Sequence, residues 1–241
     1  MQRLKLALEY DGTDFVGWAR QPGLRTVEAE LREALRRVFA SFDELIVAGR
    51  TDAGVHALGQ AVSVAVGGCG PATEHAAAAL NAVLPSDVAV LSAEDVPDDF
   101  NARYSASGRS YRYRVLTARH AAPLRRAQVH HYPRSLDEHE LDASAAVIVG
   151  EHDFEAFTKT KTHHDSFICT VRRATWRRAG DELIFEIDAN RFLRHMIRSL
   201  VGTMLEQSAE DIRALLASGN RNDAGTTAPG RGLYLVSVAY D

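Results

Sequence analysis

The spacing of apolar residues in the first hundred positions restricts the fold more than any other feature of the sequence. Apolar residues that alternate predict strands, and apolar residues that recur every three or four positions predict helices. Here the two patterns follow each other in the order β-α-β-β-α-β, which is typical of a ferredoxin-like unit. The expected strands span residues 4–10, 45–48, 61–66 and 88–91, and the expected helices span residues 27–41 and 72–83.

The first of these helices has a recognisable start. Thr26 belongs to the residue types that favour the N-cap position, where a side-chain oxygen accepts a backbone N–H. Glu28 and Glu30 place negative charge in the first turn, where the helix dipole stabilises it. We therefore expect Thr26 to cap this helix.

The second half of the chain repeats the scheme loosely. Its expected strands span residues 111–116, 127–132, 167–177, 183–189 and 233–240, and its expected helices span residues 136–149, 192–205 and 209–217. The sequence thus predicts an α+β fold of two related halves whose sheets join. We place the N-terminal half at residues 1–99 and the C-terminal half at residues 100–241.

Charge is distributed unevenly along the chain, although the net charge is only −4. Residues 1–99 carry a net charge of −7, and residues 135–241 carry −5. Between them, residues 100–134 contain eight arginines and no carboxylate, a net charge of +8. Such a segment suits contact with a phosphate backbone. The alternative is a solvated basic strand that pairs with acidic neighbours elsewhere in the fold.

Several classes of protein are excluded by the sequence. It has no run of about 20 apolar residues that would span a membrane, and it does not begin with a signal peptide. Cys69 and Cys169 are too far apart to form a CxxC motif. The paired histidines at 130–131 and 163–164 lack the spacing of a metal site. We therefore expect a cytoplasmic protein without metal or cofactor.

One candidate site is the loop expected at residues 48–57. Arg50 and Asp52 lie there between two glycines, which indicates unusual backbone angles and a close approach to another group. A tight turn would pair Arg50 with Asp52 or direct both at one ligand. The alternative is an ordinary Asx-turn between two strands.

Two further segments combine arginine with aromatic or helical patterns. In the strand expected at 111–116, Tyr111 and Tyr113 share one face and arginines share the other, which suits RNA binding as well as an amphipathic core strand. Farther along, basic side chains recur at helical spacing and predict one basic stripe at the start of a helix, or else a solvated helix face. The stripe consists of Arg191, Arg194, His195 and Arg198.

Taken together, these segments resemble the TruA-type tRNA pseudouridine synthases in six blocks that keep the family's order. The most specific block is Gly49-Arg50-Thr51-Asp52-Ala53-Gly54-Val55-His56-Ala57. The other blocks lie at residues 10–18, 100–103, 109–113, 192–198 and 228–235. The resemblance therefore extends over almost the whole chain.

The resemblance implies a fold, an activity and a partner. The family fold has two ferredoxin-like halves that share a mostly antiparallel sheet around a central basic cleft. Its members isomerise uridine to pseudouridine at positions 38, 39 and 40 of the tRNA anticodon stem-loop and need no cofactor or metal. They act as homodimers, so the resemblance implies a homodimer that binds tRNA.

Four residues match the catalytic positions of the family. Asp52 matches the catalytic aspartate, whose carboxylate attacks C1′, attacks C6 or removes a proton from the sugar; the sequence leaves these routes open. Arg50 matches the arginine near that carboxylate. Tyr111 matches the tyrosine that stacks on uracil and helps to remove the C5 proton. Arg198 matches a second arginine, placed to pair with the aspartate.

Further residues are expected to bind the substrate. Leu233 matches the apolar residue that walls the base pocket, and the inferred contacts to the RNA backbone are Arg20, Gln21, Arg103, Arg109, Arg112, Arg114, Arg191 and Arg194. Ala19 and Arg194 stand where the family often has glutamine and histidine, which bears on the choice among uridines. The alternatives are a synthase for other RNA, a noncatalytic RNA-binding or RNA-folding protein, and an enzyme acting on a phosphorylated small molecule.

Overall fold

The computed structural model describes residues 1–159 and 166–241. Within these residues the chain forms two compact units, and each is described by itself. The first unit contains residues 1–107 and 234–241, and the second contains residues 108–233.

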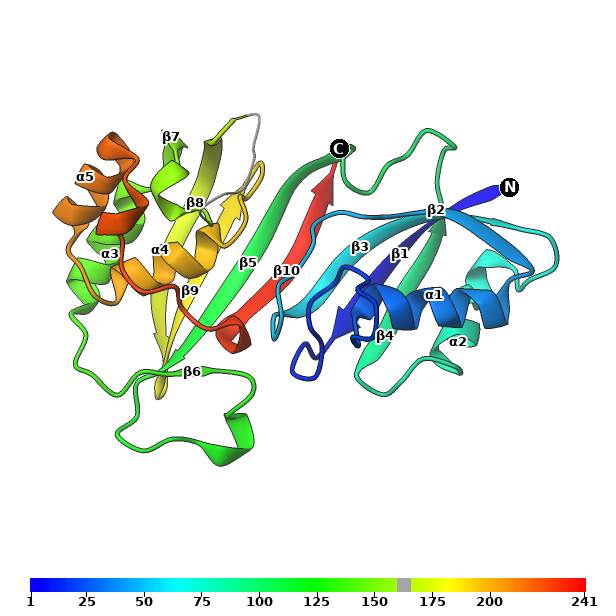
Figure 1. The fold of residues 1–241 in the computed structure, drawn as a ribbon, viewed down its shortest axis with the longest axis horizontal. Coiled ribbons are helices and arrows are strands. Elements are labelled where there is room, and N and C mark those ends of the chain that lie inside the picture. The colour runs from blue at the N-terminus through cyan, green and yellow to red at the C-terminus, as the bar shows by residue number, and fades with distance from the viewer. Residues whose placement is uncertain (160–165) are drawn as a thin grey trace. The chain divides into compact units, whose positions relative to one another are not determined.

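The first unit is built on an antiparallel sheet with strand order β4-β1-β3-β2, and its helices α1 and α2 pack against each other (Figure 1). This is the sheet order of a ferredoxin-like unit, so the predicted element order is confirmed. The elements are β1 (Gln2–Tyr10), α1 (Val27–Val38), β2 (Ser41–Val47), β3 (His56–Gly67), α2 (Thr73–Asn81) and β4 (Val88–Asp95).

The core of the first unit follows from the alternation of apolar residues in its strands. Leu4, Leu6 and Leu8 of β1 are buried, together with Leu31 and Leu35 of α1. A further strand, β10 (Leu233–Tyr240), pairs in parallel with the beginning of β3. The long strand β3 thus pairs with β2 near its end and with β10 near its beginning, next to the loop that precedes it.

The N-terminus of α1 differs from the prediction in one respect. Thr26 occupies the N-cap position, but its hydroxyl makes no capping hydrogen bond, and it is buried without a partner in the described part of the chain. Instead, the N–H groups of Val27 and Glu28 donate to the carbonyls of Gly17 and Trp18, at 3.3 and 3.1 Å. The preceding chain therefore satisfies the first helical amides, which a capping side chain satisfies in many other helices.

The second unit has an antiparallel sheet with strand order β5-β9-β8-β7, with three helices gathered beside it (Figure 1). A short strand, β6 (His130–His131), pairs in parallel with the end of β5. The elements are β5 (Ala106–Leu116), α3 (Glu138–Val147), β7 (Gly150–Asp153), β8 (Ile168–Ala179), β9 (Glu182–Ala189), α4 (Met196–Met204) and α5 (Ala209–Ser218). Single 3₁₀ turns occur at Pro123–Arg125, Glu155–Phe157, Arg221–Asp223 and Gly230–Gly232.

The predicted basic stripe at the start of α4 is wrong, because the helix begins at Met196 rather than at residue 192. The side-chain oxygen of Asn190 accepts from the N–H groups of Arg191 and Thr170, at 2.7 and 2.9 Å, and so ties this segment to β8. His195 then takes a left-handed backbone conformation with φ of 68°. Arg198 is the one member of the predicted stripe that lies in the helix.

Two boundaries in the first unit also differ from the prediction. The first helix ends at Val38 rather than at residue 41, because Ser41 already pairs with Gly67 of β3 as the first residue of β2. β3 itself begins at His56, five residues before the predicted position, because its first residues pair with β10. Pairing with distant strands overrides local periodicity in both places.

Candidate active-site residues

The loop between β2 and β3 carries Asp52 on a turn whose shape requires glycine. The N–H of Val55 donates to the carbonyl of Asp52 at 3.2 Å, which closes a four-residue turn. Gly54 is the third residue of this turn and has φ of 71°, a value that glycine adopts without strain. Asp52 is half-buried, whereas Thr51 before it and Val55 after it are buried. Gly54 therefore shapes the turn that carries the Asp52 carboxylate.

The segment at residues 10–18 packs directly on this loop. The N–H of Trp18 donates to the carbonyl of Thr51 at 3.0 Å, and the N–H of Gly54 donates to the carbonyl of Phe15 at 3.2 Å. A Cβ atom added at Gly12 would lie 2.1 Å from the carbonyl oxygen of Val55. Glycine is therefore required where the two backbones meet. Two of the six blocks, far apart in the sequence, thus form one packed structure around Asp52.

A buried set of neutral polar side chains also contacts the loop. The hydroxyl of Tyr10 is 2.8 Å from the hydroxyl of Thr51. The amide nitrogen of Gln60 donates to the carbonyl of Gly49 at 2.7 Å and to the Tyr10 hydroxyl at 3.3 Å. Tyr10 belongs to the block at residues 10–18, but neither it nor Gln60 was predicted as a site residue, because the sequence does not show that their side chains meet at the loop.

Arg50, which matches a catalytic position, and the predicted RNA contacts of the first unit are exposed. Arg50 precedes the Asp52 turn, and Arg20 and Gln21 lie on the loop before α1. Arg103 lies on a turn closed by the Asn101 side chain, whose oxygen accepts from the N–H groups of Arg103 and Tyr104 at 3.0 and 3.1 Å. The guanidinium of Arg103 lies 5.4 Å from the ring centre of Tyr104. All of these side chains are therefore accessible to a ligand.

In the second unit, Tyr111 lies on the buried face of β5. Its ring meets the ring of Phe192 edge-to-face, with 5.0 Å between their centres, and 9% of the residue is exposed. Phe192 belongs to the segment that was predicted to be helical and is not. The irregular backbone there places an aromatic ring beside Tyr111.

Arg198 is joined to the loop that precedes β10. Its Nε donates to the carbonyl of Ala228 at 2.7 Å, and the N–H of Ala228 donates back to the carbonyl of Arg198 at 2.9 Å. The hydroxyl of Tyr113 donates to the carbonyl of Pro229 at 2.8 Å, and burial raises the pKa of this phenol far above its ordinary value. Leu233, at the end of this loop, is buried. Arg198, Tyr113 and Leu233 therefore belong to one connected region of the second unit.

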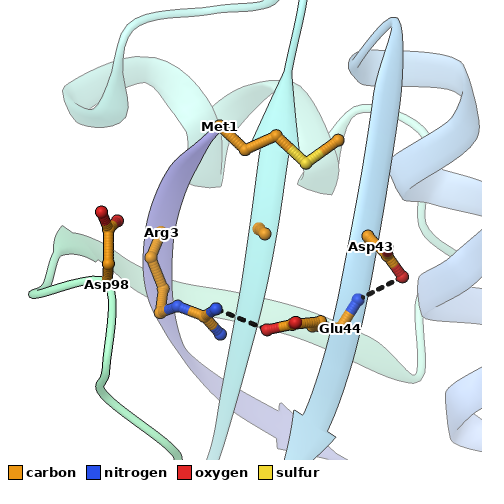
Figure 2. Close-up of a pocket in the computed structure, with 6 residues that line it drawn as sticks. Met1, Arg3, Asp43, Glu44 and Asp98 are labelled. Atoms are coloured by element: carbon orange, nitrogen blue, oxygen red, sulfur yellow. Dashed lines mark hydrogen bonds and ion pairs between the residues drawn. The ribbon is translucent and has the colours of Figure 1, made fainter.

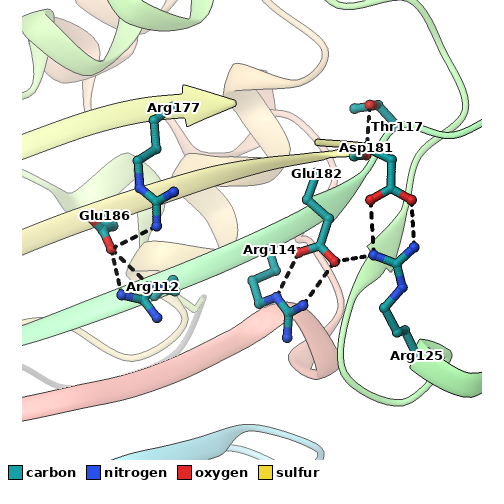
Figure 3. A network of polar contacts seen from close by, with 8 residues as sticks. All are labelled: Arg112, Arg114, Thr117, Arg125, Arg177, Asp181, Glu182 and Glu186. Atoms are coloured by element: carbon teal, nitrogen blue, oxygen red, sulfur yellow. Dashed lines mark hydrogen bonds and ion pairs between the residues drawn. The ribbon is translucent and has the colours of Figure 1, made fainter. Parts of the chain in front are cut away.

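The basic strand β5 pairs with carboxylates of β9 (Figure 3). Arg112 donates twice to Glu186, at 3.0 and 2.8 Å, and Arg114 forms a two-pronged pair with Glu182, at 2.8 and 2.9 Å. Arg125 also reaches Glu182, at 2.6 Å. The acid-free segment at 100–134 is thus partly neutralised by carboxylates from another part of the chain, as the alternative interpretation of its charge stated.

The same face of the sheet carries arginines that the sequence analysis did not identify. Arg173 and Arg177 of β8 lie 4.0 and 3.8 Å from Glu186, which Arg112 already engages. Their side chains are 64% and 49% exposed. A register argument would have found them, because residues of β8 and β9 that lie opposite each other share a face.

The remaining predicted contacts of the second unit lie near β8 and α4. Arg109 donates to the carbonyl of Asn190 at 3.1 Å, and Arg191 donates to the carbonyl of Ser166 at 3.0 Å. Arg194 is exposed, and its own carbonyl accepts from the N–H of Lys159 at 3.1 Å. Arg191 and Arg194 therefore lie on an irregular segment, whereas Arg109 lies on β5.

A pocket in the first unit is lined by more acidic than basic side chains, unlike the basic face of the second unit (Figure 2). It lies at the start of β1, whereas the Asp52 loop contacts the end of that strand. Arg3 pairs with Glu44 across it at 2.5 Å, and Asp43 and Asp98 add further negative charge. This excess of carboxylates disfavours a phosphate group.

The described residues, 1–159 and 166–241, contain neither a cluster of metal-binding side chains nor a membrane-spanning helix. No three His, Cys, Asp or Glu side chains in these ranges gather in a way that would hold a metal ion. The paired histidines at 163–164 lie outside the described residues. No helix in the described ranges is both long and apolar enough to cross a membrane.

Comparison with known proteins assigns the family. The sequence model of the family described as "tRNA pseudouridine synthase" matches residues 6–105 and 145–241. The chain is 43% identical over 239 residues to tRNA pseudouridine synthase A of Halalkalibacterium halodurans, covering 97% of this chain and 90% of that protein. It is 40% identical over 250 residues to the enzyme of the same name from Anoxybacillus flavithermus, with both chains covered completely. The enzyme of that name from Bacillus subtilis is 39% identical over 246 residues, and 99% of each chain is covered. The chain therefore belongs to the tRNA pseudouridine synthase family.

Proposed function

We propose that the protein isomerises uridine to pseudouridine in tRNA. The observation that carries this proposal is the match to the family over almost the whole chain, with relatives about 40% identical from end to end. The reaction detaches uracil from C1′, rotates it and rejoins it through C5. It needs a carboxylate and a shaped base pocket, and the chain carries residues suited to both.

Asp52 is the proposed catalytic carboxylate. It lies on a turn fixed by backbone hydrogen bonds on both sides, and it is half-buried. A carboxylate in a fixed position loses little freedom when it reacts, which favours catalysis. Its partner in the reaction is either C1′, C6 or a sugar proton. Arg50 and Arg198 are the proposed arginines that stabilise the ionised carboxylate.

Tyr111 and Leu233 are the proposed contacts to the base. A tyrosine ring stacks readily on a nucleobase that has left its own stack, and the edge-to-face contact with Phe192 fixes the orientation of the Tyr111 ring. Tyr111 also takes part in removing the C5 proton, as a base or through a water. Leu233 supplies the apolar wall of the pocket.

The proposed substrate region is the anticodon stem-loop, with uridines 38, 39 and 40 as targets. The proposed contacts to its backbone are Arg20, Gln21, Arg103, Arg109, Arg112, Arg114, Arg191 and Arg194. We also propose that the protein is a homodimer and acts in the cytoplasm. A homodimer provides two copies of the basic segment for one tRNA.

The test is nucleotide-resolved mapping of pseudouridine in an unmodified tRNA transcript that has uridine at positions 38, 39 and 40. Purified protein is added without metal or cofactor. We expect pseudouridine at one or more of these positions. Product at other uridines alone would contradict the proposed target, and no product on any tRNA would contradict the proposed reaction.

A further inference from the structure

Tyr10 and Gln60 contact the Asp52 loop at Thr51 and Gly49. We propose that Tyr10 and Gln60 are positioning residues that hold this loop in its reactive shape, acting through Thr51 and Gly49. The inference rests on the proposed catalytic role of Asp52. Neither residue touches a substrate atom in this account, so neither is a catalytic residue.

The two hydrogen bonds that Gln60 makes in this network have a defined direction. The carbonyl of Gly49 only accepts, so the group of Gln60 that lies 2.7 Å from it must be the amide nitrogen. The same nitrogen donates its second hydrogen to the Tyr10 hydroxyl at 3.3 Å. The Tyr10 hydroxyl also lies 2.8 Å from the Thr51 hydroxyl, and either oxygen can be the donor in that contact. The three side chains therefore form one connected chain of hydrogen bonds that ends at Thr51.

Burial makes this network sensitive to the loss of any member. Tyr10 is 2% exposed, Gln60 is fully buried and Thr51 is 7% exposed. A buried polar group that loses its partner cannot recover the hydrogen bond from water. Burial also raises the pKa of Tyr10 to about 12, so its hydroxyl remains protonated throughout the neutral range.

The network forms hydrogen bonds with the loop at two residues close to Asp52. Gly49 lies three residues before the carboxylate, and Thr51 lies directly before it. The N–H of Trp18 also holds the carbonyl of Thr51. Thr51 is thus held both by its side chain and by its backbone. Loss of the side-chain contact allows Thr51 to shift and moves Asp52 with it.

The first test is Tyr10→Phe, which removes only the hydroxyl and keeps the ring near Trp18, 6.1 Å away. The matched control is Tyr132→Phe, which removes a hydroxyl that donates to the carbonyl of Leu205 at 2.9 Å in the second unit. Single-turnover rate and Kd are measured with an unmodified tRNA transcript. We expect Tyr10→Phe to lower the rate by about 10- to 100-fold, the effect of a small misplacement. Its Kd should stay within about two-fold of the wild type, and the control should keep its rate.

A second pair of variants separates positioning from general packing. Thr51→Ser keeps the hydroxyl, whereas Thr51→Val keeps the shape and removes it. We expect Thr51→Ser to react at nearly the wild-type rate and Thr51→Val to be as slow as Tyr10→Phe. Because both changes break the same bond, the double variant should be no slower than the slower single variant.

Hydrogen exchange of the backbone amides at residues 51–55 gives a readout that does not depend on activity. We expect faster exchange in Tyr10→Phe than in the wild type, and no change in Tyr132→Phe. An unchanged rate in Tyr10→Phe, unchanged exchange, or an equal loss of rate in both tyrosine variants would overturn the inference. If the wild type forms no pseudouridine, the proposed function fails, and the exchange measurement alone decides whether Tyr10 positions the loop.

Discussion

The Asp52 loop and the basic face of β5, β8 and β9 are held in place by different forces. Backbone hydrogen bonds and neutral, buried side chains fix the loop at Thr51 and Gly54. Ion pairs order the basic face, and its outermost arginines, Arg173 and Arg177, are about half exposed or more. Neutral buried contacts respond little to salt, whereas exposed ion pairs are screened by it. We therefore expect the loop to keep its geometry as the salt concentration rises, and the ion pairs of the basic face to weaken.

The largest expected effect on stability and activity comes from the backbone contact between Gly12 and Val55 of the Asp52 loop. Gly12→Ala places a Cβ atom against the carbonyl of Val55, where neither backbone can yield. We expect a loss of about 3 kcal/mol in the free energy of unfolding, the upper range for overpacking, and a strong loss of activity. Urea denaturation measures the free energy of unfolding, and single-turnover kinetics measure the activity.

Gly23→Ala is the matched control for that variant. Gly23 has φ of 73°, and a Cβ atom there would meet nothing within 4 Å. The control therefore tests conformational strain alone, about 1 kcal/mol. Equal costs for the two variants would show that the contact between the 10–18 segment and the loop is loose.

A smaller effect is expected on the basic face. Arg112→Ala should weaken tRNA binding by about 10-fold and reduce the salt slope by about one, because one phosphate contact is lost. Glu186→Gln should strengthen binding, because it removes the carboxylate that competes for Arg112. Filter binding over a range of salt concentrations measures both.

Arg36→Ala is the control for these variants, because Arg36 is an exposed arginine of α1 that pairs only locally with Glu33. It should change neither the affinity nor the slope. An unchanged slope in Arg112→Ala would remove Arg112 from the RNA contacts. Weaker binding in Glu186→Gln would show that the ion pair organises the face instead of competing with phosphate.

The smallest expected effect is a dependence of stability on pH in the second unit. Burial, with the nearby charge of Arg231, lowers the pKa of His130 from 6.5 to about 4. The folded protein therefore holds His130 neutral while the unfolded chain binds a proton below pH 6.5. This contribution to stability is complete above about pH 6.5 and is lost as the pH falls toward 4.

His130→Phe should reduce this loss of stability between pH 6.5 and 4, as measured by urea denaturation at several pH values. Tyr10→Phe should lower the free energy of unfolding by the same amount at every pH in that range, because the pKa of Tyr10 lies near 12. If the free energy of unfolding changes with pH in the same way in the wild type and in His130→Phe, the lowered pKa of His130 is contradicted.

The sequence predicted the elements well where local periodicity and core packing agree. The first strand, the second helix and the hairpin around Gly180 all formed as expected. It failed at residues 190–195, where helical spacing is present but Asn190 binds the backbone of β8. A side chain that competes for backbone hydrogen bonds is invisible to a hydrophobic pattern.

The sequence also located the Asp52 block but did not reveal the contacts that hold the block in place. The glycines at 12 and 17 were visible, yet only the structure shows that they allow the backbone to approach Val55 and Thr51. Likewise, the acid-free segment was visible, but its partners Glu182 and Glu186 lie 57 to 74 residues away along the chain from the arginines that they pair with. Contacts between distant segments follow from the fold and not from any local pattern.

The most direct test of the central claim compares binding and chemistry in Asp52→Asn. This variant keeps the shape of the side chain and removes its charge. With an unmodified tRNA transcript, we predict a Kd within about three-fold of the wild type and no detectable pseudouridine at positions 38, 39 or 40. Product formed at the wild-type rate, or a loss of binding as large as the loss of product, would contradict the catalytic role of Asp52.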